Sequence, residues 1–69
     1  MMGRRALDLS VVVPVHDDAA GLERLIASLA PLGLVRELIV VDDASEVPIQ
    51  AAALPPLPGA CVRVMRIEP

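Results

Sequence analysis

Apolar and polar positions alternate in blocks along this chain, and three apolar blocks predict β-strands. Leu9–Val15 (LSVVVPV) and Glu37–Val41 (ELIVV) are nearly continuous apolar runs. Such runs are typical of strands that are covered on both faces. We expect Pro14 to end the first strand, because proline cannot donate to a β-ladder. Cys61–Ile67 (CVRVMRI) alternates apolar and polar residues well enough to predict a third strand.

The segment between the first two strands predicts an amphipathic helix. Its apolar side chains recur at the i, i+3, i+4 and i+7 spacing of one helical face. These positions are Leu22, Leu25, Ile26 and Leu29. Asp17 or Asp18 can cap the first turn and complement the helix dipole, while Pro31 and Gly33 are expected to end the helix.

The order of these elements predicts an α/β fold. A strand, a helix and a strand within roughly 35 residues form a βαβ unit, whose right-handed crossover makes the two strands parallel. Residues 48–54 form at most a doubtful short helix, with a proline near its first turn. We therefore expect three parallel strands with one clear helix and one doubtful one. Because a parallel sheet needs helices on both faces, residues 8–69 are interpreted as an incomplete domain behind an N-terminal tail, residues 1–7.

Composition argues against several classes of function. The 69 residues include no Phe, Trp or Tyr and carry a net charge of −3, which argues against stacking on bases and binding to a phosphate backbone. We therefore expect no nucleic-acid partner. The single cysteine, Cys61, permits neither an internal disulfide nor a Cys-based zinc site.

No apolar segment approaches the ~20 residues of a membrane span. We therefore expect a soluble, cytoplasmic chain, which would reach a membrane only through segments outside this sequence. Four arginines are spread over both ends of the chain, and we expect them to be solvated. They are Arg4, Arg5, Arg63 and Arg66.

Two polar clusters follow the first two predicted strands. They are Pro14–Asp18 (PVHDD) and Asp42–Ser45 (DDAS). In open parallel sheets, ligands bind outside the carboxyl ends of the strands, so the clusters are expected to face each other across one crevice. A structural alternative stays open for both. Asp17 and Asp18 would then be only helix caps, and Asp42 and Asp43 only turn formers.

Carboxylates at such strand ends point to a nucleotide-like ligand. A carboxylate can accept a hydrogen bond from a base N–H or a ribose hydroxyl, a bond that contributes about 1.5–3 kcal/mol. Two carboxylates can instead hold a divalent cation together with a diphosphate. The glycine-rich phosphate loop of a dinucleotide-binding Rossmann unit is absent, since the segment at that position, PVHDDAAG, has its only glycine at Gly21. In a two-component receiver domain, the paired acids would follow the first strand rather than the second.

The ordered pattern DLSVVVPVHDDAAGLERLIASLAPLG…ELIVVDDAS resembles the N-terminus of family 2 glycosyltransferases of the GT-A fold. That family opens with a strand ending in a P-x-Y-N-E-like motif, an amphipathic helix and a strand ending in V-V-D-D-G-S. The resemblance covers about residues 8–45, and more loosely the third strand. It implies that residues 8–69 are part of a Rossmann-like, nucleotide-binding GT-A subdomain.

The resemblance also implies a donor-binding site for a nucleotide-diphosphate sugar, with a UDP-sugar as the first expectation. The site residues that it implies are Pro14, Val15, His16, Asp18, Asp42, Asp43 and Ser45. Asp43 would recognise the base, commonly uracil through its N3–H, while Asp42 would support the loop and Ser45 would shape it. His16 stands where the family usually has Tyr, and Ala44 where Gly is common. Glycine would tolerate a positive φ at this position and alanine would not, so Ala44 leaves the exact shape of the loop open.

The resemblance further implies an inverting transferase, with Mg or Mn bound to a D-x-D motif in the complete enzyme. The present sequence contains neither a D-x-D motif nor a recognisable catalytic base. We therefore expect that this chain alone has no metal ligands, no catalytic residues and no transfer activity. The missing remainder of the catalytic domain would be its partner. Two alternatives stay open, namely a non-catalytic α/β binding module and a receiver-like regulatory domain.

Overall fold

The computed structural model describes residues 8–69 as one three-stranded sheet with helical segments. Its elements are β1 (Leu9–Val15), α1 (Ala19–Leu29), the 3-10 turn η1 (Ala30–Leu32), β2 (Val35–Asp43), the 3-10 turn η2 (Ala51–Ala53) and β3 (Cys61–Ile67). The sheet order is β1-β2-β3, and both neighbouring pairs are parallel. The predicted α/β class with three parallel strands is confirmed. The predicted tail, residues 1–7, lies outside the described residues.

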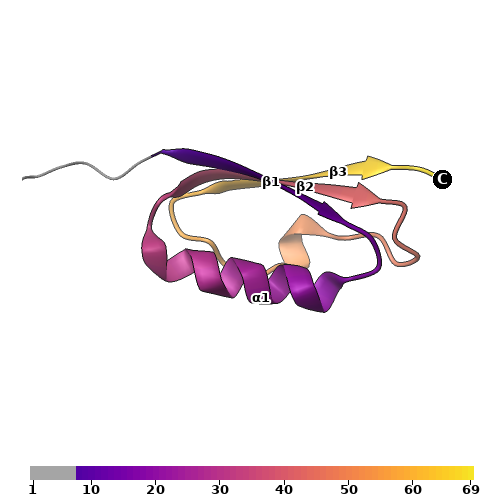
Figure 1. The fold of residues 1–69 in the computed structure, drawn as a ribbon, viewed down its shortest axis with the longest axis horizontal. Coiled ribbons are helices and arrows are strands. Elements are labelled where there is room, and N and C mark those ends of the chain that lie inside the picture. Colours follow the sequence, from indigo (N-terminus) through magenta and orange to yellow (C-terminus); the bar gives the residue numbers. More distant parts are fainter. Residues whose placement is uncertain (1–7) are drawn as a thin grey trace, which may run out of the picture.

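Helix α1 and turn η2 lie on the same side of the sheet, as Figure 1 shows. The core between these layers is entirely aliphatic, because the sequence has no aromatic residue. Its buried members are Val15, Leu22, Ile26, Val35, Leu38, Val40 and Leu57. Leu22 and Ile26 come from the predicted helical stripe, and Leu38 and Val40 come from the central strand. Burial of these aliphatic side chains is the main favourable term that holds the helix on the sheet.

The two ends of α1 are set by local chemistry. The Asp18 carboxylate accepts a hydrogen bond from the backbone N–H of Gly21 at 3.0 Å, so Asp18 is the N-cap. A Cβ atom at position 21 would collide with that carboxylate, which explains why glycine stands in the first turn. Beyond η1, Gly33 adopts a left-handed φ of 66°, which turns the chain back toward β2.

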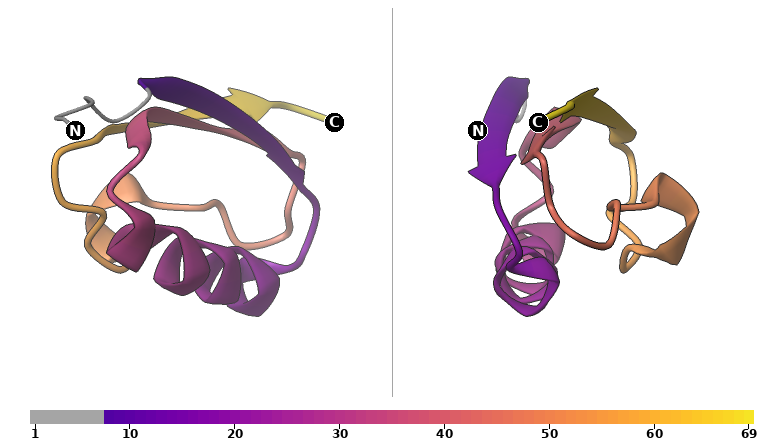
Figure 2. Two further views of the ribbon diagram at one scale, coloured as in Figure 1. Left: turned by 60° about the vertical axis from the view of Figure 1, so that its left-hand side comes forward. Right: turned by 90° about the vertical axis from the view of Figure 1, so that its right-hand side faces the viewer.

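Within residues 8–69 nothing covers the opposite face of the sheet, which corrects the expectation that the strands are buried on both faces. Val12 on β1 is 61% exposed, and Met65 and Ile67 on β3 are 56% and 52% exposed. Helix α1 and turn η2 lie on the other side of the sheet, as the two views of Figure 2 also show. Strand periodicity then places alternate side chains of each strand in solvent.

Three further sequence expectations need correction. Strand β1 continues past Pro14 to Val15, because it is an edge strand, where a missing N–H is tolerated. Strand β2 extends beyond the predicted Glu37–Val41 at both ends. The doubtful helix at residues 48–54 is only the short turn η2, which has no side-chain hydrogen bond at its N-cap.

The register of the sheet places polar residues together at its carboxyl edge. Val15 of β1 lies beside Asp42 of β2, and Asp42 lies beside Arg66 of β3. Because the strands are parallel, residues at these matched positions point to the same face. That face is the one covered by α1, since Asp42 is fully buried. The sheet therefore presents one carboxylate and one guanidinium to the segments that follow β1 and β2.

Candidate functional site

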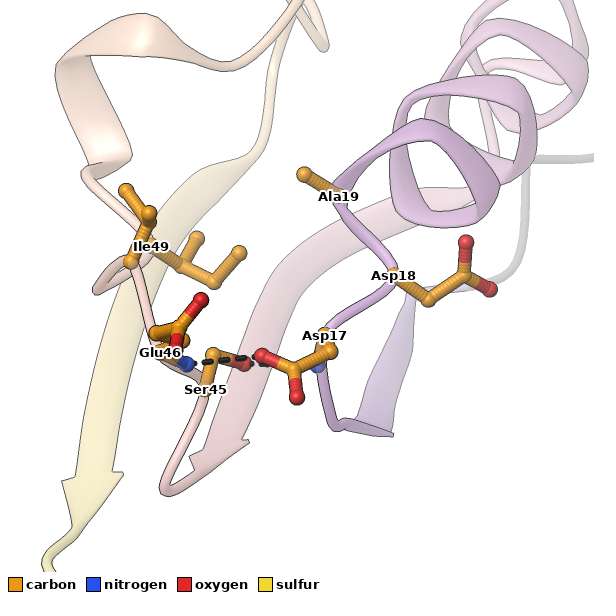
Figure 3. Close-up of a pocket in the computed structure, with 7 residues that line it drawn as sticks. Asp17, Asp18, Ala19, Ser45, Glu46 and Ile49 are labelled. Carbon is orange, nitrogen blue, oxygen red and sulfur yellow. Dashed lines mark hydrogen bonds between the residues drawn. The ribbon is translucent and has the colours of Figure 1, made fainter.

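The loops that follow β1 and β2 are joined at the carboxyl edge of the sheet, as expected from the parallel topology. The backbone N–H of Asp17 donates to the Ser45 hydroxyl oxygen at 2.9 Å. The Asp17 carboxylate in turn accepts the backbone N–H of Glu46 at 2.7 Å. These two bonds run in opposite directions between the same two loops (Figure 3). Asp17 is thus not a helix cap, one of the two alternatives for this residue, but connects the two loops.

Asp42 holds the loop after β2 from inside the protein. Its carboxylate accepts backbone N–H groups from Ser45 at 3.1 Å and from Ile49 at 3.0 Å. It also accepts a 2.8 Å bond from Arg66, whose second terminal nitrogen donates to the Ser45 carbonyl. The Ser45 side chain, the Ile49 amide and the Arg66 guanidinium together hold the pKa of Asp42 well below its usual range. Asp42 is therefore ionised and fully occupied in structural bonds.

Ala44 adopts a left-handed backbone with a φ of 55°, which corrects the expectation that alanine would avoid this conformation. Its N–H bonds the Asp42 carbonyl at 3.1 Å, and the next amide is held by the Asp42 carboxylate. These two bonds compensate for the steric cost of a Cβ atom at positive φ, which is about 1–2 kcal/mol. The DDAS loop thus keeps the turn that glycine would allow.

His16 and Asp43 lie together on the exposed rim of the site. Nδ1 of His16 lies 2.6 Å from the Asp43 carbonyl oxygen, and Nε2 lies 3.3 Å from the Asp17 carboxylate. The hydrogen bond to the Asp43 carbonyl, followed by the Asp17 charge, raises the pKa of His16. Only the protonated ring can donate from both nitrogens, so protonation of His16 strengthens its contacts with both loops.

A cavity of about 450 Å³ opens between the N-terminus of α1 and the loop after β2. Its lining residues are Asp17, Asp18, Ala19, Ser45, Glu46, Val47 and Ile49. Figure 3 shows Ala19 and Ile49 facing this space from opposite sides, while the Asp18 carboxylate points away toward the helix. All three charged residues of the lining are carboxylates. The cavity is therefore suited to hydroxyl groups and N–H donors, and bare phosphate groups would be repelled.

The predicted site residues do not share one cavity. Asp18 and Ser45 line the 450 Å³ cavity. Pro14, Val15 and Asp18 line a second cavity of about 180 Å³ between β1 and α1. The other three predicted residues are His16 and Asp43 on the rim and Asp42 in the interior.

Sequence reasoning missed Asp17, Glu46 and Arg66 as parts of this site. Arg66 was expected to be solvated, yet its side chain is 25% exposed and donates to Asp42, Ser45 and Glu68. The alternation of β3 carried a signal, since Arg66 is in phase with the half-buried Val64. Arg63 lies three positions before Arg66 and therefore points to the opposite, exposed face of the sheet. There its guanidinium pairs with the Glu37 carboxylate at 3.0 Å.

Residues 8–69 contain neither a metal-ligand cluster nor a membrane-spanning helix. Within residues 8–69, no group of three or more His, Cys, Asp or Glu side chains is arranged to hold a metal ion. Over the same residues, no helix is long and apolar enough to cross a membrane.

Comparison with known proteins links this chain to a glycosyltransferase over part of its length. It is 46% identical over 44 residues to the pre-mycofactocin glycosyltransferase of Mycobacterium tuberculosis, in both strain CDC 1551 and strain H37Rv. The match covers 64% of this chain and 8% of each relative, so the chain spans a small part of those proteins. No protein-family model matches the chain. No solved structure matches it either.

Proposed function

We propose that this chain is the N-terminal, nucleotide-binding part of an inverting, family 2-like glycosyltransferase. Its ligand would be a nucleotide-diphosphate sugar, and a UDP-sugar is the first candidate. The observation that carries the proposal is the 46% identity over 44 residues to a glycosyltransferase, in a chain whose two acidic loops meet at one sheet edge. Ligands of open parallel sheets bind at this edge.

In this proposal the adjacent acids have different roles, since Asp42 supports the loop and Asp43 recognises the base. Successive residues of a strand point to opposite faces, so Asp42 is buried while Asp43 is exposed. The Asp43 carboxylate accepts no hydrogen bond within residues 8–69 and can therefore accept the ring N–H of a uracil base. His16, in contact with the Asp43 carbonyl, lies where a base could stack beside it.

The ribose hydroxyls would enter the 450 Å³ cavity, whose carboxylates and backbone groups accept hydrogen bonds from hydroxyls. The diphosphate would need a cation, because the lining of that cavity carries only negative charge. In the complete enzyme, Mg or Mn on a D-x-D motif would supply it, and a separate base would activate the acceptor. This sequence contains neither element, so the chain alone is proposed to bind the donor without transferring the sugar.

A nucleotide titration tests the proposal on the full chain. Thermal unfolding is followed with UDP, GDP and dTDP, and with the variants Asp43→Ala and Asp8→Ala. Asp8 is a matched control, because it is an exposed aspartate that pairs with Arg36 at the opposite end of the sheet. We expect UDP to raise the melting temperature of the parent and the Asp8 variant but not that of the Asp43 variant.

A folded parent chain that none of the three nucleotides stabilises would refute the proposal. That result would favour a non-catalytic α/β binding module instead. Circular dichroism and a denaturant titration of the same sample establish whether the chain is folded.

A further inference from the structure

Among the hydrogen bonds of residues 8–69, Arg66 is the side chain of β3 that bonds the end of β2 and the loop after it. Its guanidinium donates from three nitrogens, to Asp42 Oδ2 at 2.8 Å, the Ser45 carbonyl at 3.1 Å and Glu68 Oε2 at 2.7 Å. Ser45 belongs to the segment that forms one wall of the 450 Å³ cavity, and Asp42 is bonded to the Ser45 and Ile49 amides of that wall. Arg66 itself does not line that cavity.

The contact works through the Asp42 carboxylate. One of its oxygens is shared between Arg66 and the Ile49 amide, and the other oxygen accepts the Ser45 amide. Ser45 and Ile49 both line the cavity and mark the two ends of the loop wall between them. A buried carboxylate holds such amides well only while its charge is balanced, and Arg66 provides the balancing charge.

The shape of the guanidinium matters as much as its charge. Arg66 bonds a carboxylate and a carbonyl at the same time, through two nitrogens that the guanidinium holds in a fixed planar arrangement. Lysine carries the same charge on one nitrogen and cannot present that fork. The two Arg66 bonds therefore favour one geometry of the loop after β2.

From these contacts we infer that Arg66 is a positioning residue of the candidate site. It holds the Ser45–Ile49 wall in the geometry that receives the ligand, without contacting the ligand. The nature of the ligand rests on the proposed function above, but the holding of the wall does not. Because ordering this wall in advance removes a cost of binding, the loss of Arg66 is expected to weaken nucleotide affinity.

The test compares three variants of the full chain, namely Arg66→Met, Arg66→Lys and the control Arg63→Met. Arg63 is on the same strand, but its guanidinium pairs with Glu37 on the uncovered face. Two quantities are measured, amide hydrogen exchange by NMR and the Kd for UDP. For Arg66→Met we expect faster exchange at Ser45 and Ile49 with little change in the β2 ladder, and a Kd raised roughly tenfold, the equivalent of one or two hydrogen bonds.

Arg66→Lys should fall between the parent and Arg66→Met in both measurements, and Arg63→Met should match the parent. If Arg66→Met does not fold, the same two measurements on Arg66→Lys, amide exchange at Ser45 and Ile49 and the Kd for UDP, test the inference. Unchanged exchange at Ser45 and Ile49 would overturn the inference, as would a uniform rise over the whole sheet. Faster exchange at the wall with an unchanged Kd would overturn it too.

The inference and the proposed function fail in different ways. A parent chain that binds no UDP refutes the nucleotide ligand, and with it the role of Arg66 in nucleotide affinity. Selective exchange at Ser45 and Ile49 in the same samples would still establish that Arg66 holds this wall.

Discussion

Replacing Ser45 with alanine tests whether the two loops of the site are joined as the structure shows. The Ser45 side chain is buried, at 2% exposure, and its oxygen accepts the Asp17 N–H at 2.9 Å. Ser45→Ala removes that acceptor and the hydroxyl that helps to lower the pKa of Asp42, but it keeps the Ser45 N–H bond to Asp42 and the carbonyl bond to Arg66. A hydrogen bond of this kind contributes about 1 kcal/mol to the free energy of unfolding.

That loss is large for a chain of this size. A domain of 69 residues has a free energy of unfolding of roughly 3–10 kcal/mol, and 1 kcal/mol shifts its melting temperature by about 4–8 °C. We therefore expect Ser45→Ala to lower the melting temperature by about that amount in thermal unfolding followed by circular dichroism. Exchange of the Asp17 amide should also become faster, because its acceptor is gone.

Ser28→Ala provides the matched control. Ser28 is exposed in α1, and its hydroxyl donates to the Arg24 carbonyl one turn earlier. Because alanine is the better helix former, this variant should melt at the same temperature or slightly higher. The reasoning is refuted if Ser45→Ala melts within about 1 °C of the parent, or if both variants lose the same amount.

Three further changes have clear expected outcomes. Ala44→Gly should raise the free energy of unfolding in urea by about 0.5–1 kcal/mol, because glycine relieves the positive φ at some entropic cost; an unchanged or lower value would contradict the strained turn. The pKa of His16, measured by NMR titration, should lie above its ordinary value of about 6.5, and a lower value would contradict the two contacts. Because the folded pKa is raised, the stabilisation lost in His16→Gln should be largest below pH ~6.5 and should vanish as the pH rises through the folded pKa. Leu38→Ala should cost about 2–5 kcal/mol in the same urea titration, since Leu38 is fully buried, and a cost below ~1 kcal/mol would contradict its place in the core.

The uncovered face of the sheet affects how the melting temperatures of these variants are compared. Val12, Met65 and Ile67 are more than half exposed on that face. Exposed apolar surface of this kind promotes association, so melting temperatures should be compared at one low protein concentration.

Much of the fold follows from local patterns in the sequence. The apolar stripe of α1 has the period of a helix, and the alternation of residues 61–67 has the period of a strand. The short, continuous β-branched runs indicate the other two strands by their length and composition. The handedness of the crossover then makes the strands parallel, which brings the two acidic loops to one edge without any long-range information. These steps predicted the class of the fold and the neighbourhood of PVHDD and DDAS.

The tertiary structure decided which residues of that neighbourhood do what. Alternation states that Asp42 and Asp43 point to opposite faces, but only the position of α1 determines that Asp42 is buried and Asp43 exposed. Arg66 illustrates the same limit, because an arginine in a strand is equally compatible with solvent or with a buried acid. Its role depends on the sheet register that places it beside Asp42. The sequence by itself thus determined where the polar residues gather, and the covering of a single face of the sheet decided which of them hold the site and which remain open to a ligand.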